Sequence, residues 1–289
     1  MDNLFADMSK FGINVDDDMQ LFEEEKKDTG MPGTGRGGSV ARELTEEDFI
    51  IEKIINCPLC DVVSKVKVVK ASKAKRLEPD RDLRPRYQGV DANKYGVTVC
   101  THCGYAALDK YFKPLPSAQE KLIREKISMN FNGSSFKTAL PTYSYDMAVE
   151  RYKLALLNCV VKKGKVSERA YLCLRTAWVY RGMAENLDQR NPDYADMKAE
   201  CNKMENEFLK NALEGFIKAS MSESYPICGM DEATVDYLIT ALAVNFKKYD
   251  IASKCLARIL SSSQANRRIK DKAYDLKQEI IEEMKKHKQ

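Results

Sequence analysis

The chain carries two short cysteine motifs, Cys57-Pro-Leu-Cys60 and Cys100-Thr-His-Cys103, and these stretches decide how its N-terminal part must fold. Two residues between cysteines allow both thiolates of one tight turn to reach the same metal ion. Two such turns complete a tetrahedral shell of four sulfurs, which is the arrangement of a structural zinc site. Because this shell leaves no coordination position for a substrate, the motifs indicate a metal-stabilised binding module rather than a hydrolytic metalloenzyme.

The residues that flank each motif predict a strand on either side of a cysteine turn. Valine alternates with lysine or serine over residues 62–70, the period of a half-exposed strand, and residues 95–99 run as a strand into the second turn. Asp61 and Gly104 follow the two turns, where the backbone often needs a residue that tolerates positive φ. Residues 47–116 are therefore predicted to form a zinc ribbon. The expected ligands of its structural Zn2+ are Cys57, Cys60, Cys100 and Cys103.

Two other chemistries of the cysteine pairs are alternatives. A rubredoxin-like iron site also uses four thiolates and would carry an electron. The interval between the pairs is longer than in a compact rubredoxin and is rich in lysine and arginine. Dithiol redox chemistry would need a thioredoxin-like βαβ context, which the sequence does not show. His102 lies between two ligands and is expected to point outward rather than to bind the metal.

The composition is that of a soluble globular chain. Of its 289 residues, 44% are hydrophobic and 31% are charged, and no apolar run approaches the roughly 18 residues that span a bilayer. The first residues lack the basic region and the apolar core of a signal peptide. An odd number of cysteines, nine, argues against a disulfide framework. We therefore expect a cytoplasmic protein without membrane contact.

Charge is distributed unevenly along the chain. Residues 1–48 hold thirteen acidic and five basic residues, a net of −8, so the remainder carries about +12. Residues 1–46 are predicted to be a disordered acidic arm, because the glycine-rich stretch 29–38 has the composition of a flexible linker. The alternative is a short docking helix that folds on a partner or on this protein. Its apolar face would consist of Leu4, Phe5, Met8 and Phe11.

The segment between the cysteine pairs is strongly basic. Residues 61–90 hold nine lysines or arginines and four acidic residues. Such a stretch can bind phosphates and stack bases, or it can receive an acidic partner such as the arm, through an attraction that salt screens. Charge runs on small ribbons are otherwise simply solvated faces. The candidate contact residues are Lys73, Lys75, Arg76, Arg84, Arg86 and Tyr87.

From residue 117 onward the hydrophobic pattern is helical. Consecutive helix pairs, and the small-aromatic-small spacing of Ala148, Tyr152 and Ala155, suggest a tetratricopeptide-like solenoid over residues 117–289. The predicted fold class is therefore α+β and mostly α, with a small four-cysteine zinc ribbon followed by this solenoid. The helices are predicted at 117–131, 144–162, 167–187, 193–220, 231–247, 249–261 and 265–286.

Four stretches of the chain have a familiar form: Cys57-Pro-Leu-Cys60, Arg84-Pro-Arg-Tyr87, residues 99–107 (VCTHCGYAA) and residues 172–181 (LCLRTAWVYR). They resemble a bacterial family of uncharacterised proteins, domain of unknown function 2225, over roughly residues 47–260. The resemblance implies a zinc ribbon joined to tetratricopeptide-like helices, without an established activity. Asp61 departs from the glycine usual in the family at that position, and the acidic arm looks like an addition.

The sequence predicts a non-enzymatic adaptor that binds protein partners, or another copy of itself, through the helical surface. It shows no phosphate-binding glycine loop after a strand, no Ser-His-Asp set and no HExxH motif. Two alternatives are a nucleic-acid-binding ribbon protein and a rubredoxin-like electron-transfer module.

Overall fold

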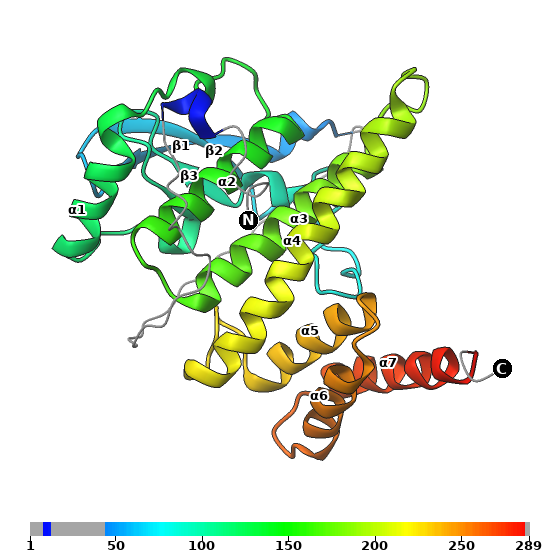
Figure 1. Cartoon of the computed structure of the whole chain (residues 1–289). Helices are drawn as coiled ribbons and strands as arrows, with labels where there is room; N and C mark the ends of the chain where they lie inside the picture. Colours follow the sequence, from blue (N-terminus) through cyan, green and yellow to red (C-terminus); the bar gives the residue numbers. More distant parts are fainter. Residues whose placement is uncertain (1–7, 13–43, 287–289) are drawn as a thin grey trace.

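The computed structural model describes residues 8–12 and 44–286, and helices predominate within this part of the chain (Figure 1). Each of the predicted helices is present. The first ends at Lys126 rather than near residue 131, because the backbone tightens into a 3-10 turn at Ser128–Asn130 that lets Phe131 stack on Phe136. The α-helices are α1 (Ser117–Lys126), α2 (Tyr145–Val161), α3 (Val166–Glu185), α4 (Tyr194–Ser222), α5 (Glu232–Asn245), α6 (Tyr249–Ser261) and α7 (Arg267–Lys286).

Within the described residues, four short strands form two separate antiparallel hairpins. In the first hairpin, β1 (Ile50–Asn56) pairs with β2 (Val63–Val69); in the second, β3 (Val97–Val99) pairs with β4 (Ala106–Leu108). One cysteine motif lies at the turn of each hairpin, as the sequence predicts. The architecture is thus α+β and mostly α, which confirms the predicted fold class.

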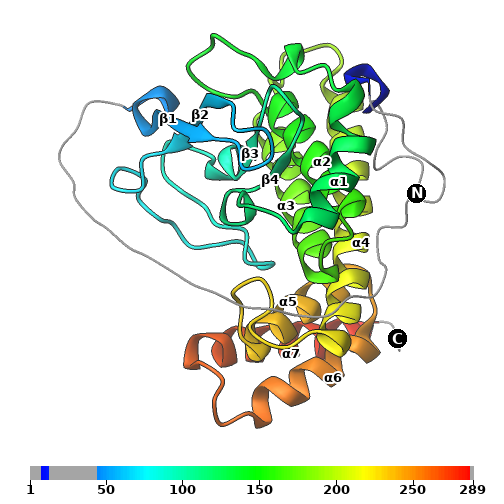
Figure 2. The ribbon, with the colours of Figure 1, turned by 90° about the vertical axis from the view of Figure 1, so that its left-hand side faces the viewer.

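The helices pack mainly against their neighbours in sequence. α2, α3 and α4 lie side by side, and α5, α6 and α7 gather at one end of the long α4 (Figure 1). Both hairpins lie beside α2 and α3, on one side of the helical layer (Figure 2). The tetratricopeptide-like repeat stays a prediction; helix lengths here range from 10 residues in α1 to 29 in α4.

The two hairpins differ in what they bury. Every residue of β3 and β4 is buried, and these strands belong to the same hydrophobic core as the helices. Half of the strand residues of the first hairpin are exposed, among them Ile54, 68% accessible, and Val63, 65% accessible. Its buried end contributes Ile50 to a small separate cluster with Tyr95 and Tyr143. The predicted boundary at residue 116 therefore falls between two segments that share one core.

A short N-terminal segment, the 3-10 turn Met8–Phe11, packs on the body of the protein. Phe11 is fully buried, its ring centroid lies 4.7 Å from that of Phe136, and its carbonyl accepts a 2.8 Å hydrogen bond from the amide of Asn132. Phe11 thus agrees with the docking alternative. The remainder of the predicted arm, including Leu4 and Phe5, lies almost entirely outside the described residues.

Candidate metal centre

The four predicted ligands come together at one point between the hairpins. Their sulfur atoms all lie within 4.8 Å of one another. The Sγ atoms of Cys57 and Cys103 are 3.7 Å apart, and those of Cys60 and Cys100 are 3.6 Å apart. A disulfide would bring two sulfurs to about 2.05 Å, whereas a tetrahedron with metal–sulfur bonds of about 2.3 Å has edges of about 3.8 Å. The donor set therefore fits one tetrahedral metal ion, and it is the only such group of potential ligands within the described part of the chain.

Both cysteine turns have the same backbone design. The amide of Asp61 donates to the carbonyl of Cys57 at 2.9 Å, and the amide of Gly104 donates to that of Cys100 at 3.0 Å. To close these turns, Asp61 adopts a φ of 57° and Gly104 a φ of 76°. The positive φ predicted after each motif is thus confirmed. Aspartate is among the few residues other than glycine that visit this region routinely.

The backbone of each turn also directs amide dipoles at a sulfur. The amides of Leu59 and Cys60 hydrogen-bond to the sulfur of Cys57, and those of His102 and Cys103 to the sulfur of Cys100. Hydrogen bonds from Cys103 and Cys57 lower the pKa of Cys100 to about 2, while the contact with Cys100 raises the pKa of Cys57 to about 12. Four sulfurs at this distance cannot all ionise unless a cation lies among them. A divalent metal would supply that charge.

Two helices hold the cysteine turns from outside. Arg124 of α1 donates a hydrogen bond to the carbonyl of Leu59 in the first turn. Asn158 of α2, fully buried, donates to the carbonyl of Gly104 in the second turn at 3.0 Å. His102 is exposed, as predicted. The four sulfurs can thus close the coordination shell without it, and a metal bound here would have a structural role.

The candidate basic contacts divide into two groups. Arg84 is buried, with Glu185 at 3.0 Å and Asp91 at 3.3 Å, and Arg86 pairs with Glu185 at 2.6 Å. These two arginines thus pair with carboxylates of the chain itself, and their role as contacts for a partner stays a prediction. Tyr87 is half-buried beside the small cluster. The candidates that remain exposed are Lys73, Lys75 and Arg76.

The same segment, here called the connecting loop (residues 70–91), is fixed to α3 by further carboxylates. Arg181 contacts Asp80 at 3.0 Å and Asp82 at 2.7 Å, and the indole Nε1 of Trp178 donates to Asp82 at 2.9 Å. Burial alone would raise the pKa of Asp80, but hydrogen bonds from Arg86 and Arg181 outweigh it and lower that pKa. Local sequence does not predict this network. Its only sequence signal is the alternation of acidic and basic residues in the loop.

Fold and site together define a ribbon of two cysteine hairpins, here called the metal ribbon, which packs on a helical body and whose four sulfurs could hold a metal ion. The family model described as an uncharacterized protein conserved in bacteria (DUF2225) matches residues 50–280. The chain therefore belongs to this bacterial family, as its resemblance implied. Comparisons with curated proteins and with solved structures gave no match. Among the described helices, none has the length and apolar character needed to cross a membrane.

Proposed function

We propose that this protein is a non-enzymatic, zinc-stabilised adaptor that works in the cytoplasm and binds protein partners through its helical surface. The observation that carries the proposal is the closed cluster of four sulfurs. Since the protein can fill every position of a tetrahedral shell, the metal has none left for a substrate. Its contribution is to hold the exposed first hairpin against the buried second one.

The order of the helices supports a role in display. α3 packs along α4 and α5 packs along α6, so that helices adjacent in sequence form packed pairs. Stacked pairs of this kind present extended concave surfaces to peptides in solenoid proteins. Helix α2 meanwhile packs on both strands of the second hairpin, which places the metal ribbon and the helical layer in one body.

The test combines metal analysis with purification from a native bacterial host. We expect one zinc ion per chain, and a defined complex with a protein partner, or with a second copy, that survives nuclease treatment and is absent for Cys100→Ser. A chain that binds zinc but stays monomeric and free of partners under crosslinking would contradict the adaptor. Red protein with visible absorbance, containing iron, would favour the electron-transfer alternative.

A second candidate function, nucleic-acid binding, is favoured by the three exposed cations of the connecting loop. Lys73, Lys75 and Arg76 have no ion-pair partner among the described residues. A nucleic-acid complex would weaken steeply with salt, and Lys73→Gln/Lys75→Gln would reduce that salt dependence. Variants of Arg84 and Arg86 are unsuitable for this test, because both side chains hold the loop in place.

A further inference from the structure

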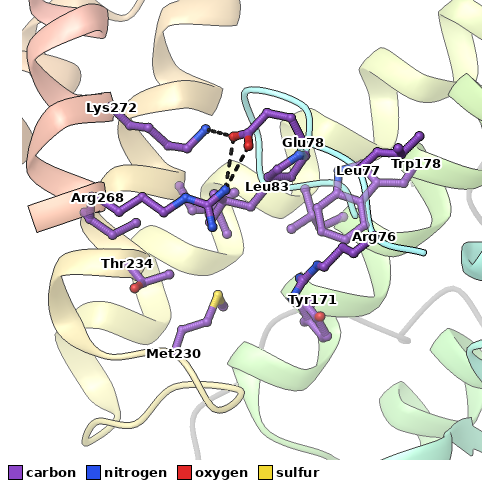
Figure 3. Close-up of a pocket in the computed structure, with 14 residues that line it drawn as sticks. Arg76, Leu77, Glu78, Leu83, Tyr171, Trp178, Met230, Thr234, Arg268 and Lys272 are labelled. Atoms are coloured by element: carbon purple, nitrogen blue, oxygen red, sulfur yellow. Dashed lines mark hydrogen bonds and ion pairs between the residues drawn. The ribbon is translucent and has the colours of Figure 1, made fainter. Parts of the chain in front are cut away.

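A cavity of about 560 Å3 lies between the connecting loop, α3, α5 and α7 (Figure 3). Pockets for small organic ligands commonly have volumes of about 300 to 1,000 Å3. Tyr171 and Trp178 enter from α3, while Arg268 and Lys272 enter from α7 on the opposite wall. None of the four sulfurs lines the cavity.

The inner wall of the cavity is apolar and aromatic. Leu174, Trp178 and Leu238 are buried there, and Tyr171 stands edge-on to Trp178 with ring centroids 6.4 Å apart. Leu83 of the connecting loop is half-buried on the same wall. This surface suits an aromatic or aliphatic group, because its transfer from water to such a wall is favourable.

The rim of the cavity is cationic. Glu78 of the connecting loop bridges Arg268 at 3.0 Å and Lys272 at 2.9 Å (Figure 3). Hydrogen bonds from Lys272 and then Arg268 lower the pKa of Glu78, so this side chain is an anion at neutral pH. Arg76, the third cation, has no carboxylate partner among the described residues. Three cations and one carboxylate leave the lining with a net charge of +2.

We propose that this cavity binds a small organic anion, namely a carboxylate, phosphate or sulfonate carried on an apolar body. The apolar body would lie against Trp178 and Leu238. The anionic group would bind Arg268 and Lys272 in place of Glu78, which is 69% exposed and can swing into solvent at little cost. This site is independent of the metal centre and goes beyond the adaptor function, since it gives the helical body a ligand of its own.

The geometry favours a small molecule over a macromolecule. The connecting loop and three helices wall the cavity on several sides, whereas an extended peptide needs an open channel. A neutral apolar ligand would leave two charges of the rim uncompensated next to it. A cationic ligand would be repelled by the same charges. The ligand that fits this cavity therefore carries both an anionic group and an apolar body.

The chain supplies its own probe for this site. Trp178 is its only tryptophan and lines the cavity, so its fluorescence reports on occupancy without a label. We would titrate the zinc-loaded full chain with octanoate, octyl phosphate and octanol, and measure affinities in parallel by calorimetry. We expect both anions to change the emission of Trp178 saturably, and octanol to bind at least about tenfold more weakly, because hydrogen bonds to charged groups are among the stronger ones. The ratio between carboxylate and phosphate identifies the preferred anionic group.

One variant that should weaken octanoate binding and one that should strengthen it distinguish an effect on the site from a general loss of stability. Arg268→Gln should weaken octanoate binding about tenfold, because it removes a charged donor. Glu78→Gln should strengthen it about twofold to fivefold, because it removes the competing carboxylate of an exposed ion pair. Glu279→Gln is the matched control: this carboxylate of α7 pairs with Arg81 outside the cavity, and its loss should leave the affinity unchanged.

Three results would overturn the proposal. They are equal affinity for octanoate and octanol, no saturable change with either anion at millimolar concentration, and a Glu78→Gln variant that binds no more tightly than Glu279→Gln. None of these results touches the adaptor proposal, whose readouts are zinc content and complex formation.

Discussion

The two cysteine hairpins supply two sulfurs each to the candidate metal site, yet they are held in the protein in different ways. The second hairpin, β3–β4, is wholly buried and is part of the main core. The first, β1–β2, exposes half of its strand residues and packs at its open end on a small cluster, while Cys57 and Leu59 of its turn reach the main core. We expect the second hairpin to stay in place through its packing, and the first to depend more on a metal bound by the four sulfurs. The cluster thus joins a weakly held element to a strongly held one.

Loss of one ligand should have the largest effect. Cys100→Ser is expected to lower the zinc content from about one ion per chain to near zero. It should also destabilise the ribbon by several kcal/mol, because structural zinc contributes about 10 kcal/mol or more to the folding of small zinc domains. Metal analysis and thermal unfolding measure both effects. Cys201→Ala, which removes a buried cysteine of α4, controls for the loss of a thiol and should retain zinc. A Cys100→Ser protein with unchanged zinc and stability would disprove the metal site.

The residue after each motif should show the next largest difference. In Gly104→Ala the new Cβ would lie 2.7 Å from Cγ of Phe131, at a φ of 76°. We expect a loss of about 2 kcal/mol or more, from backbone strain together with overpacking. Asp61→Gly should be neutral or stabilising by up to about 1 kcal/mol, because glycine adopts positive φ more readily. Urea unfolding in the presence of zinc compares the two variants. Equal changes in the free energy of unfolding for the two variants would contradict the view that the second hairpin is held more firmly than the first.

A smaller difference is expected between the two helix contacts. Asn158→Leu leaves the buried carbonyl of Gly104 without its donor, which should cost about 1 to 3 kcal/mol. Arg124→Gln alters an exposed side chain beside the first turn and should cost about 1 kcal/mol or less. The free energies of unfolding of both variants test this order. The reverse order would mean that the first turn is the more firmly held.

The smallest effect concerns pH and the connecting loop between the hairpins. The arginine contacts hold the pKa of Asp80 below its ordinary value of 3.8. Its contribution to stability is therefore complete above that value and is lost as the pH falls through the lower folded-state pKa. The Asp80→Asn variant should be less stable than the wild type at neutral pH. The difference in free energy of unfolding should become smaller as the pH falls below 3.8 and Asp80 of the wild type is protonated. A constant difference from neutral pH down to about pH 3 would contradict the assigned ion pairs.

Much of the metal centre and the helical order could be predicted from local sequence. The spacing of the cysteines predicts the metal ligands, and the residue types at positions 61 and 104 predict a backbone with positive φ after each cysteine turn. Helix positions follow from hydrophobic periodicity, since an amphipathic helix needs only its own residues to reveal its period.

Contacts between distant segments could not be predicted in this way. The local sequence presents Arg84 as a partner contact because its nearest counter-ion, Glu185 at 3.0 Å, lies 101 residues further along the chain. The cavity depends on the same kind of long-range juxtaposition, in which Glu78 meets Lys272 across 194 residues. Charge patterns within a window show that a loop is basic, but they do not show which carboxylates of a packed helix will face it.

The claim that a metal ion holds the first hairpin in place is tested most directly by hydrogen exchange on the full chain, with zinc bound and after removal of zinc by a chelator. We predict that the backbone amides of Ile50–Asn56 and Val63–Val69 lose protection when zinc is removed, while those of Tyr145–Val161 and Val166–Glu185 keep theirs. Protection of the first hairpin that does not change on metal removal, or an equal loss in the hairpin and in both helices, would contradict this account.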